Sequence, residues 1–301
     1  MKLNFILLRF LKSMNKLNKS YIACISICIL CFYACNREKS DVPTYLNLLP
    51  AQFEIQANTG TSNQHIEDYW LYAGNELIGV FHPGQAAPVI GEDVKDLSVH
   101  AGIRINGLRD NAYIYPFFDN YRSQVDLCAC ADSIDIQPVF KYLPTAKFSF
   151  IDDFENDNKF TVDVDENPAT SITLQGSVVN EGSYALALNV DSFNRVNAIT
   201  TQAFYNDFAS DGRDVYLEFH YKSDFNFLAG LEANTSGGKA YDLPFGIYAS
   251  DVWKKMYINL KDLVVSSKAE YGYRVVFSVQ HPGGNIRAGK LYLDNIKLVH
   301  Y

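Results

Sequence analysis

DVYLEFHYKSD, residues 214–224, alternates apolar and polar side chains over its first eight positions. A period of two is typical of a β-strand that buries one face in a core. The predicted core face is Val215, Leu217, Phe219 and Tyr221, and the opposite face is Tyr216, Glu218 and His220.

Short segments of this kind recur from residue 148 to the C-terminus, with turn residues between them. No amphipathic segment of helical length interrupts the series. Eight strands in about 150 residues predict a jelly roll or a related β-sandwich. We expect the strands at residues 171–175, 184–190, 198–204, 214–221, 227–232, 253–260, 273–279 and 290–299.

Four segments in this part of the chain resemble the galactose-binding-like jelly rolls of carbohydrate-binding modules. They are FIDDFE (150–155), DVYLEFHYKSD (214–224), SDVWKKMYINL (250–260) and GKLYLDNIKLV (289–299). The resemblance covers residues 151–299, about half of the chain. It implies a non-catalytic domain that binds glycan.

The last of these segments also predicts an irregular strand. Leu291 and Leu293 share one face, but the next apolar residues are Ile296 and Leu298, so the alternation slips at Asp294. A β-bulge would produce this slip. In the resembling modules, an aspartate near this position and acids near the start of the domain bind a structural calcium ion, whose ligands are oxygen atoms. The implied calcium ligands are Asp153, Glu155 and Asp294; the alternative is that they are turn and loop-capping residues.

Alternation in three strands also predicts a ligand-binding face. If these strands share a sheet, their polar faces together present aromatic, amide and charged groups, which bind sugars by ring stacking and hydrogen bonds. A solvated face without a ligand has the same composition and is the alternative. The predicted ligand-binding residues are Tyr216, Glu218, His220, Lys255, Tyr257 and Arg274.

Residues 42–147 predict a second, smaller β-sandwich, which resembles Ig-like and transthyretin-like domains. Residues 97–105 alternate with Leu97 and Val99 on the buried side, and Gly74-Asn75 predicts a tight hairpin between two strands. Strand signals also occur at 45–56 and 133–142. The boundary with the jelly roll is expected at residues 147 and 148, so the fold class is all-β throughout.

Two features of this smaller domain allow more than one interpretation. The segment NAYIYPFFDNY, residues 111–121, carries five aromatic rings around Pro116 and is either an exposed interaction surface or the cover of a sandwich end. Cys128 and Cys130 fall on one side of a strand. We interpret them as small strand residues, with a disulfide or half of a zinc site as alternatives.

The N-terminus predicts export and lipid anchoring. Five basic residues and no acidic ones precede a short apolar run that ends at Ala34-Cys35. A run of about a dozen residues suits a signal peptide better than a membrane span. Ala34-Cys35 resembles the lipobox of bacterial lipoproteins, and the combination of lipobox, Ig-like domain and jelly roll is similar to Bacteroidota surface lipoproteins. We expect a signal peptide at 1–34, lipidation of Cys35, a linker at 35–41 and an outer-membrane location.

Charge and missing motifs narrow the function. Without residues 1–34 the chain has 21 basic and 34 acidic residues, a formal charge of −13. Such a chain repels phosphate backbones, so we expect no nucleic-acid partner. The sequence has no G-x-S-x-G, G-x-G-x-x-G or H-E-x-x-H motif, and no pair of acids stands out as a glycosidase pair. We therefore expect a binding protein for glycan or, alternatively, an accessory subunit that binds an outer-membrane protein.

Overall fold

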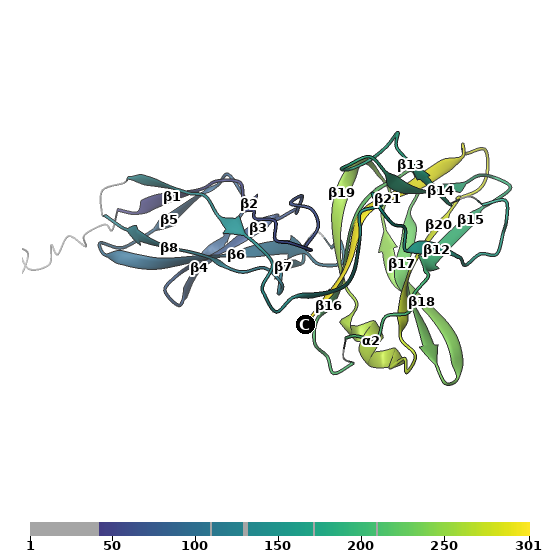
Figure 1. Cartoon of the computed structure of the whole chain (residues 1–301). Coiled ribbons are helices and arrows are strands. Elements are labelled where there is room, and N and C mark those ends of the chain that lie inside the picture. The colour runs from purple at the N-terminus through teal and green to yellow at the C-terminus, as the bar shows by residue number, and fades with distance from the viewer. Residues whose placement is uncertain (1–41, 109, 129–131, 171, 209) are drawn as a thin grey trace, which may run out of the picture. The chain divides into compact units, whose positions relative to one another are not determined.

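The computed structural model describes residues 42–108, 110–128, 132–170, 172–208 and 210–301 (Figure 1). The predicted signal peptide, the linker and Cys35 lie outside these ranges, as does Cys130. Pro43–Tyr301 form one compact unit, so the division into domains at residues 147 and 148 stays a prediction. Within the described residues, no helix has both the length and the apolar character needed to cross a bilayer.

The strands nearer the N-terminus form three sheets. β1 pairs with β5 and, in parallel, with β9, while β2 pairs in parallel with β10. The third sheet has the order β4-β3-β6-β7, and β8 also pairs with β6. The bounds are β1 Thr44–Leu48, β2 Gln52–Phe53, β3 Asp68–Ala73, β4 Glu76–Phe81, β5 Ala86–Val89, β6 Val94–Arg104, β7 Ala112–Ile114, β8 Tyr121–Asp126, β9 Ser133–Ile136 and β10 Val139–Phe140.

Two local predictions for these strands are confirmed. The hairpin between β3 and β4 turns at Gly74, whose φ of 59° lies in the left-handed region that glycine tolerates. Along β6 the residues at every second position are buried, as the alternation predicted. The buried residues are Leu97, Val99, Ala101 and Ile103.

The strands from residue 147 onward form a second sandwich, here called the C-terminal sandwich. One sheet has the order β13-β14-β21-β16-β19, with β11 also paired to β21, and the other has the order β12-β15-β20-β17-β18. The bounds are β11 Lys147–Asp152, β12 Phe160–Asp163, β13 Ile172–Gln175, β14 Ala185–Val190, β15 Val196–Thr201, β16 Val215–Ser223, β17 Phe227–Thr235, β18 Gly238–Ile247, β19 Ser250–Asn259, β20 Tyr273–Gln280 and β21 Gly289–His300.

All eight predicted strands are present, and the all-β fold class is confirmed. The sequence did not predict β11, β12 or β18, nor α2 (Lys261–Ser267), the one helix in the described part of the chain. β18 pairs only with β17 and is mostly exposed, so its side chains do not alternate between core and solvent. α2 has seven residues and buries only Val264, which is too little for a helical period to show.

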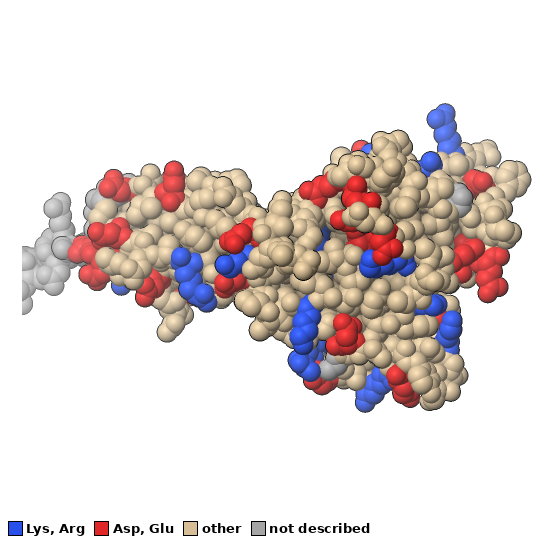
Figure 2. All heavy atoms as spheres, in the orientation of Figure 1, with Lys and Arg blue, Asp and Glu red and all other residues tan. Residues whose placement is uncertain are grey.

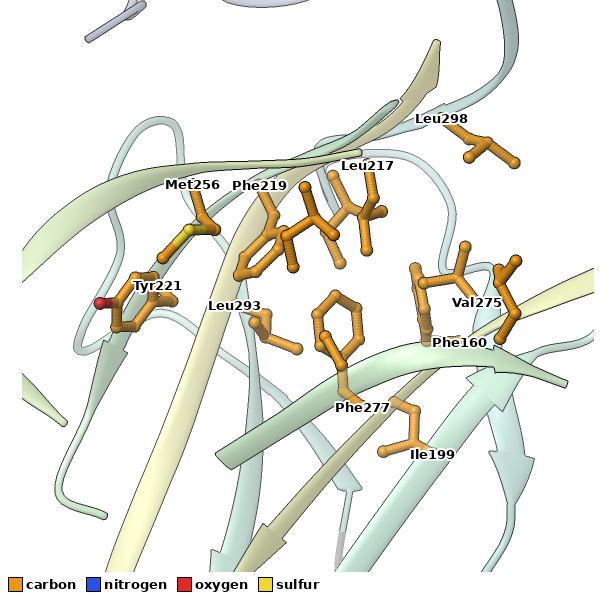
Figure 3. Close-up of a cluster of buried hydrophobic side chains, with 14 of the residues drawn as sticks. Phe160, Ile199, Leu217, Phe219, Tyr221, Met256, Val275, Phe277, Leu293 and Leu298 are labelled. Carbon is orange, nitrogen blue, oxygen red and sulfur yellow. The ribbon is translucent and has the colours of Figure 1, made fainter. Parts of the chain in front are cut away.

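The core of the C-terminal sandwich lies between its two sheets (Figure 3). Phe219 and Leu217 of β16 point toward Phe277 and Val275 of β20, and the ring centres of Phe219 and Phe277 are 5.0 Å apart. Phe160 adds a third ring, 5.6 Å from Phe277. Val215, Leu217, Phe219 and Tyr221 are all buried here, which confirms the predicted core face of residues 214–224.

The predicted bulge in the last strand is also confirmed. Glu218 faces Lys297 and His220 faces Asp294, so one residue of β16 lies opposite two residues of β21. Asn295 takes the extra position with a φ of 49°. Bulges re-aim side chains, and this one lets Lys297 and Asp294 both lie buried beside β16.

The structure decides between the alternatives for two features of residues 42–147. In the aromatic segment, Tyr115, Phe117 and Phe118 are buried, so this segment covers the end of a sandwich and is not an exposed interaction surface. Tyr115 packs on Tyr216 of the C-terminal sandwich, with ring centres 5.1 Å apart. Cys128 is disulfide-bonded, so its interpretation as a plain strand residue is wrong.

Candidate binding site

The predicted ligand-binding face is a buried layer and not a surface. Tyr216 and Glu218 have no exposed area, and His220 and Tyr257 are each 2% exposed. The side chain of Lys255 is 1% exposed. The prediction of an open face is therefore wrong for these five residues, because segments nearer the N-terminus, including Tyr115 and Tyr142, cover it.

The sixth predicted residue lies in another sheet. β16 and β19 pair as expected, but β20, which carries Arg274, belongs to the opposite sheet. There the Arg274 guanidinium lies 4.0 Å from the ring centre of Phe204 and donates to the carbonyl of Gln202 at 2.7 Å. It also pairs with the buried carboxylate of Glu232 at 3.6 Å. Arg274 is thus held by its own sheet and does not join the other five residues.

Five buried side chains form what we call the Glu218 cluster. The Glu218 carboxylate pairs with Lys255 Nζ at 3.0 Å and accepts hydrogen bonds from the hydroxyl groups of Tyr115 (2.5 Å) and Tyr142 (2.9 Å). Lys297 Nζ donates to the Tyr142 hydroxyl at 3.1 Å. The cluster therefore ties the segment before residue 147 to the C-terminal sandwich.

Electrostatics keep the Glu218 carboxylate charged. Burial alone would raise the pKa of Glu218, but Lys255, Lys297 and the tyrosine hydroxyl groups outweigh burial and hold that pKa below its ordinary value. Burial lowers the pKa of Lys255, and it lowers the pKa of Lys297 to about 7, although Glu218 opposes the shift in both. Two lysines thus share one carboxylate in the interior, which gives the cluster a structural role.

The implied calcium ligands are occupied by main-chain hydrogen bonds. Asp153 accepts from the N–H of Glu155 at 3.2 Å, and Glu155 accepts from Ser183 N–H at 2.7 Å. Asp294 accepts from the N–H groups of Asn180 (3.0 Å) and Asn295 (2.8 Å). In the described ranges, no group of three or more His, Cys, Asp or Glu side chains is placed to hold a metal ion. These residues do not fit a common site as they stand, and calcium binding stays a prediction.

An open pocket of about 510 Å³ lies on the outer side of the second sheet of the C-terminal sandwich. We call it the Leu228 pocket. Leu228 of β17 lies opposite Gly246 of β18 and Ser278 of β20, so three neighbouring strands form its floor. Its lining residues are Val196, Asn226, Phe227, Leu228, Gly246, Ile247, Tyr248, Ser278, Gln280 and Pro282.

The Leu228 pocket combines exposed apolar side chains with uncharged polar ones. Leu228 is 44% exposed and the Tyr248 ring, in the turn between β18 and β19, is 81% exposed. Ser278 and Gln280 supply a hydroxyl and an amide from β20. Ser278 and Gln280 alternate with the buried residues Phe277 and Val279 along β20, a pattern that marks them as outward-facing. No such pattern marks Tyr248, because that residue lies between two strands. None of the lining side chains is charged.

No protein-family model and no curated protein matches the sequence. Similar solved structures include the xylan-binding CBM22-1 domain from Paenibacillus barcinonensis, with 12% identity and a TM-score of 0.38 over 52% of this chain and 94% of that one. The family 11 carbohydrate-binding module from Clostridium thermocellum, in complex with a β-1,3-1,4-mixed-linked tetrasaccharide, has 15% identity and a TM-score of 0.36 over 51% and 94%.

A third similar structure is the enzymatically active domain of tailspike protein 4 of bacteriophage CBA120. It has 18% identity and a TM-score of 0.35, and the match covers 49% of this chain and 20% of that one. This chain therefore spans about a fifth of the tailspike structure. With TM-scores below 0.5, none of these likenesses assigns a ligand to this chain.

Proposed function

We propose that this protein is a non-catalytic, lipid-anchored outer-membrane protein that binds a neutral glycan in the Leu228 pocket. The observation that carries the proposal is an exposed tyrosine ring beside an apolar floor and uncharged hydrogen-bonding groups. Sugars present apolar C–H faces that stack on aromatic rings, and hydroxyl groups that bond to amides and hydroxyls. Because no charged side chain lines the pocket, a neutral saccharide fits it best.

The size and position of the pocket support the same conclusion. A volume of about 510 Å³ lies within the usual range for small-molecule sites. Its floor belongs to paired strands, and a floor built on strands is held more rigidly than one built on loops. Because this floor is already formed, little ordering of the main chain is needed when a ligand binds, which lowers the cost of binding.

Anchoring through Cys35 is the part of the proposal that rests on sequence. The apolar run before Cys35 and the polar linker after it support lipidation, and two or more acyl chains would give stable membrane attachment. Acidic side chains are spread over the face shown in Figure 2, which suits a protein held to the bilayer by lipid and not by charge. We expect mass spectrometry of the membrane fraction to find an acylated Cys35 at the N-terminus. An unmodified Cys35 in a soluble mature protein would contradict the anchor.

The alternative function, an accessory subunit that binds an outer-membrane protein, has less support than glycan binding. A broad exposed apolar patch at residues 113–121 would have favoured a protein partner, but Tyr115, Phe117 and Phe118 of this segment are buried. Buried rings cannot form the centre of a protein interface. We therefore retain glycan as the proposed partner.

A glycan array probed with the full chain in detergent tests the proposal. We expect neutral oligosaccharides to bind, and Leu228→Asp to weaken that binding at least tenfold, because it places a charge in the apolar floor. Leu174→Asp is the matched control: Leu174 is 45% exposed and Leu228 is 44% exposed, but Leu174 lies on β13 in the other sheet. Equal loss of binding in both variants, or an array without any bound glycan, would contradict the proposal.

A further inference from the structure

A second pocket, of about 480 Å³, lies where residues before 109 meet the C-terminal sandwich. We call it the His220 pocket. It shares Gly246, Ile247 and Tyr248 with the Leu228 pocket, but its remaining lining is different. The lining residues that matter here are Asn180, His220, Trp253, Lys254, Lys255 and Tyr257.

His220 is buried in the wall of this pocket. It is 2% exposed, and neither ring nitrogen makes a hydrogen bond of good geometry, although the main chain of Asn63 lies close to the ring. Burial, together with Lys255 and Lys297, lowers the pKa of His220 to about 2, although the main chain of Asn63 favours the charged ring slightly. The ring is therefore neutral, with one N–H donor and one acceptor nitrogen.

One further buried polar atom in the same pocket, the amide nitrogen of Asn180, lacks a hydrogen-bond partner. The Lys255 ammonium pairs with Glu218 at 3.0 Å, and an ammonium has three N–H donors, so Lys255 keeps donors for a ligand. Each unsatisfied buried polar group costs about 1–3 kcal/mol, and most buried polar groups in folded proteins are satisfied. Two such side chains, beside a lysine that keeps unused donors, indicate a site whose ligand supplies the missing partners.

The charged side chains around the pocket indicate whether a ligand would have to supply hydrogen-bond donors or acceptors. Lys254 is exposed and forms none of the ion pairs found among the described residues. Glu67, the acid in the lining, is already paired with His65 (3.2 Å) and Arg104 (3.3 Å). The nearby Glu181 carboxylate also attracts Lys255, but it accepts a hydrogen bond from Asn295 at 3.1 Å. The side chains with unused hydrogen-bonding groups thus mostly offer donors, and two of them, Lys254 and Lys255, are cationic.

We propose that the His220 pocket binds an acidic monosaccharide, that is, a sugar-sized ligand with one carboxylate. The carboxylate would accept hydrogen bonds from Lys255, Asn180 and the N–H of His220, and a ligand hydroxyl would donate to the other ring nitrogen. Trp253 supplies an aromatic face within the same lining. The proposal is independent of the Leu228 pocket, whose lining is uncharged and suits a neutral glycan.

Isothermal titration of the full chain in detergent with sodium glucuronate and with glucose tests this site. We expect glucuronate to bind at least tenfold more tightly than glucose. Asn180→Asp keeps the size of the side chain but places a second carboxylate in the pocket, so it should weaken glucuronate binding at least tenfold. Lys254→Gln should weaken it severalfold, whereas Lys290→Gln, an exposed lysine outside the pocket, should not change it.

A second readout separates this proposal from the neutral-glycan site. A carboxylate bound against the ring changes the hydrogen bonding and the local field at His220, so the His220 ring resonances should shift on adding glucuronate and not on adding glucose. Leu228→Asp should leave glucuronate binding unchanged, so the two sites can fail separately. Equal affinities for glucuronate and glucose, no saturable binding of glucuronate, or binding unaffected by both Asn180→Asp and Lys254→Gln would overturn the proposal.

Discussion

Replacing Glu218 with glutamine is expected to lower the free energy of unfolding by about 3–5 kcal/mol. The substitution keeps the shape of the side chain and leaves an oxygen that can accept from Tyr115 and Tyr142. It removes the one carboxylate that pairs with Lys255 and lies beside Lys297, and both lysines are buried. An uncompensated buried charge costs far more than a lost surface ion pair.

Urea unfolding of the full chain measures this effect, with Glu76→Gln at an exposed position as the control. The double variant Glu218→Gln with Lys297→Met should recover part of the loss, because it removes one of the two unpaired cations. A loss below about 1 kcal/mol in Glu218→Gln would show that the cluster is not the joint described here.

Replacing Phe277 with alanine is expected to cost about 3–5 kcal/mol of unfolding free energy. Phe277 is fully buried between the sheets of the C-terminal sandwich, with Phe219 and Phe160 against it (Figure 3). The paired strands around the ring cannot close fully over the space it would leave, so a cavity term adds to the lost burial. The same urea experiment measures the change.

Phe193→Ala is the matched control, because Phe193 is 92% exposed. Its substitution should change the unfolding free energy by no more than about 0.5 kcal/mol. Similar losses in the two variants would contradict the assignment of Phe277 to a closely packed core.

Alternation in the sequence was sufficient to find eight strands of the C-terminal sandwich and the core face of β16, but it did not show what covers the other face. Tyr216, Glu218 and His220 were correctly placed opposite the core face of β16. A face of this polar composition can be exposed to solvent, or it can be covered by another segment with its charged groups paired in the interior. What decides between these outcomes is the packing of Tyr115 and Tyr142, more than 70 residues away in sequence from Glu218.

The second feature that the sequence could not predict was which strands belong to the same sheet. Arg274 and Lys255 both lie opposite core residues in their own strands, and alternation cannot show that β20 and β19 belong to different sheets. The slip at Asp294 was readable because a bulge changes the period within one strand. The Leu228 pocket was not readable, because three strands and a turn must come together to form it.

The most direct test of glycan binding is a crystal structure of the full chain with a neutral oligosaccharide selected on the array. We expect a sugar ring on the floor formed by Leu228 and Ser278, next to the ring of Tyr248, with a hydroxyl bonded to Gln280. Saccharide bound elsewhere on the chain, with the Leu228 pocket open to solvent, would contradict this expectation.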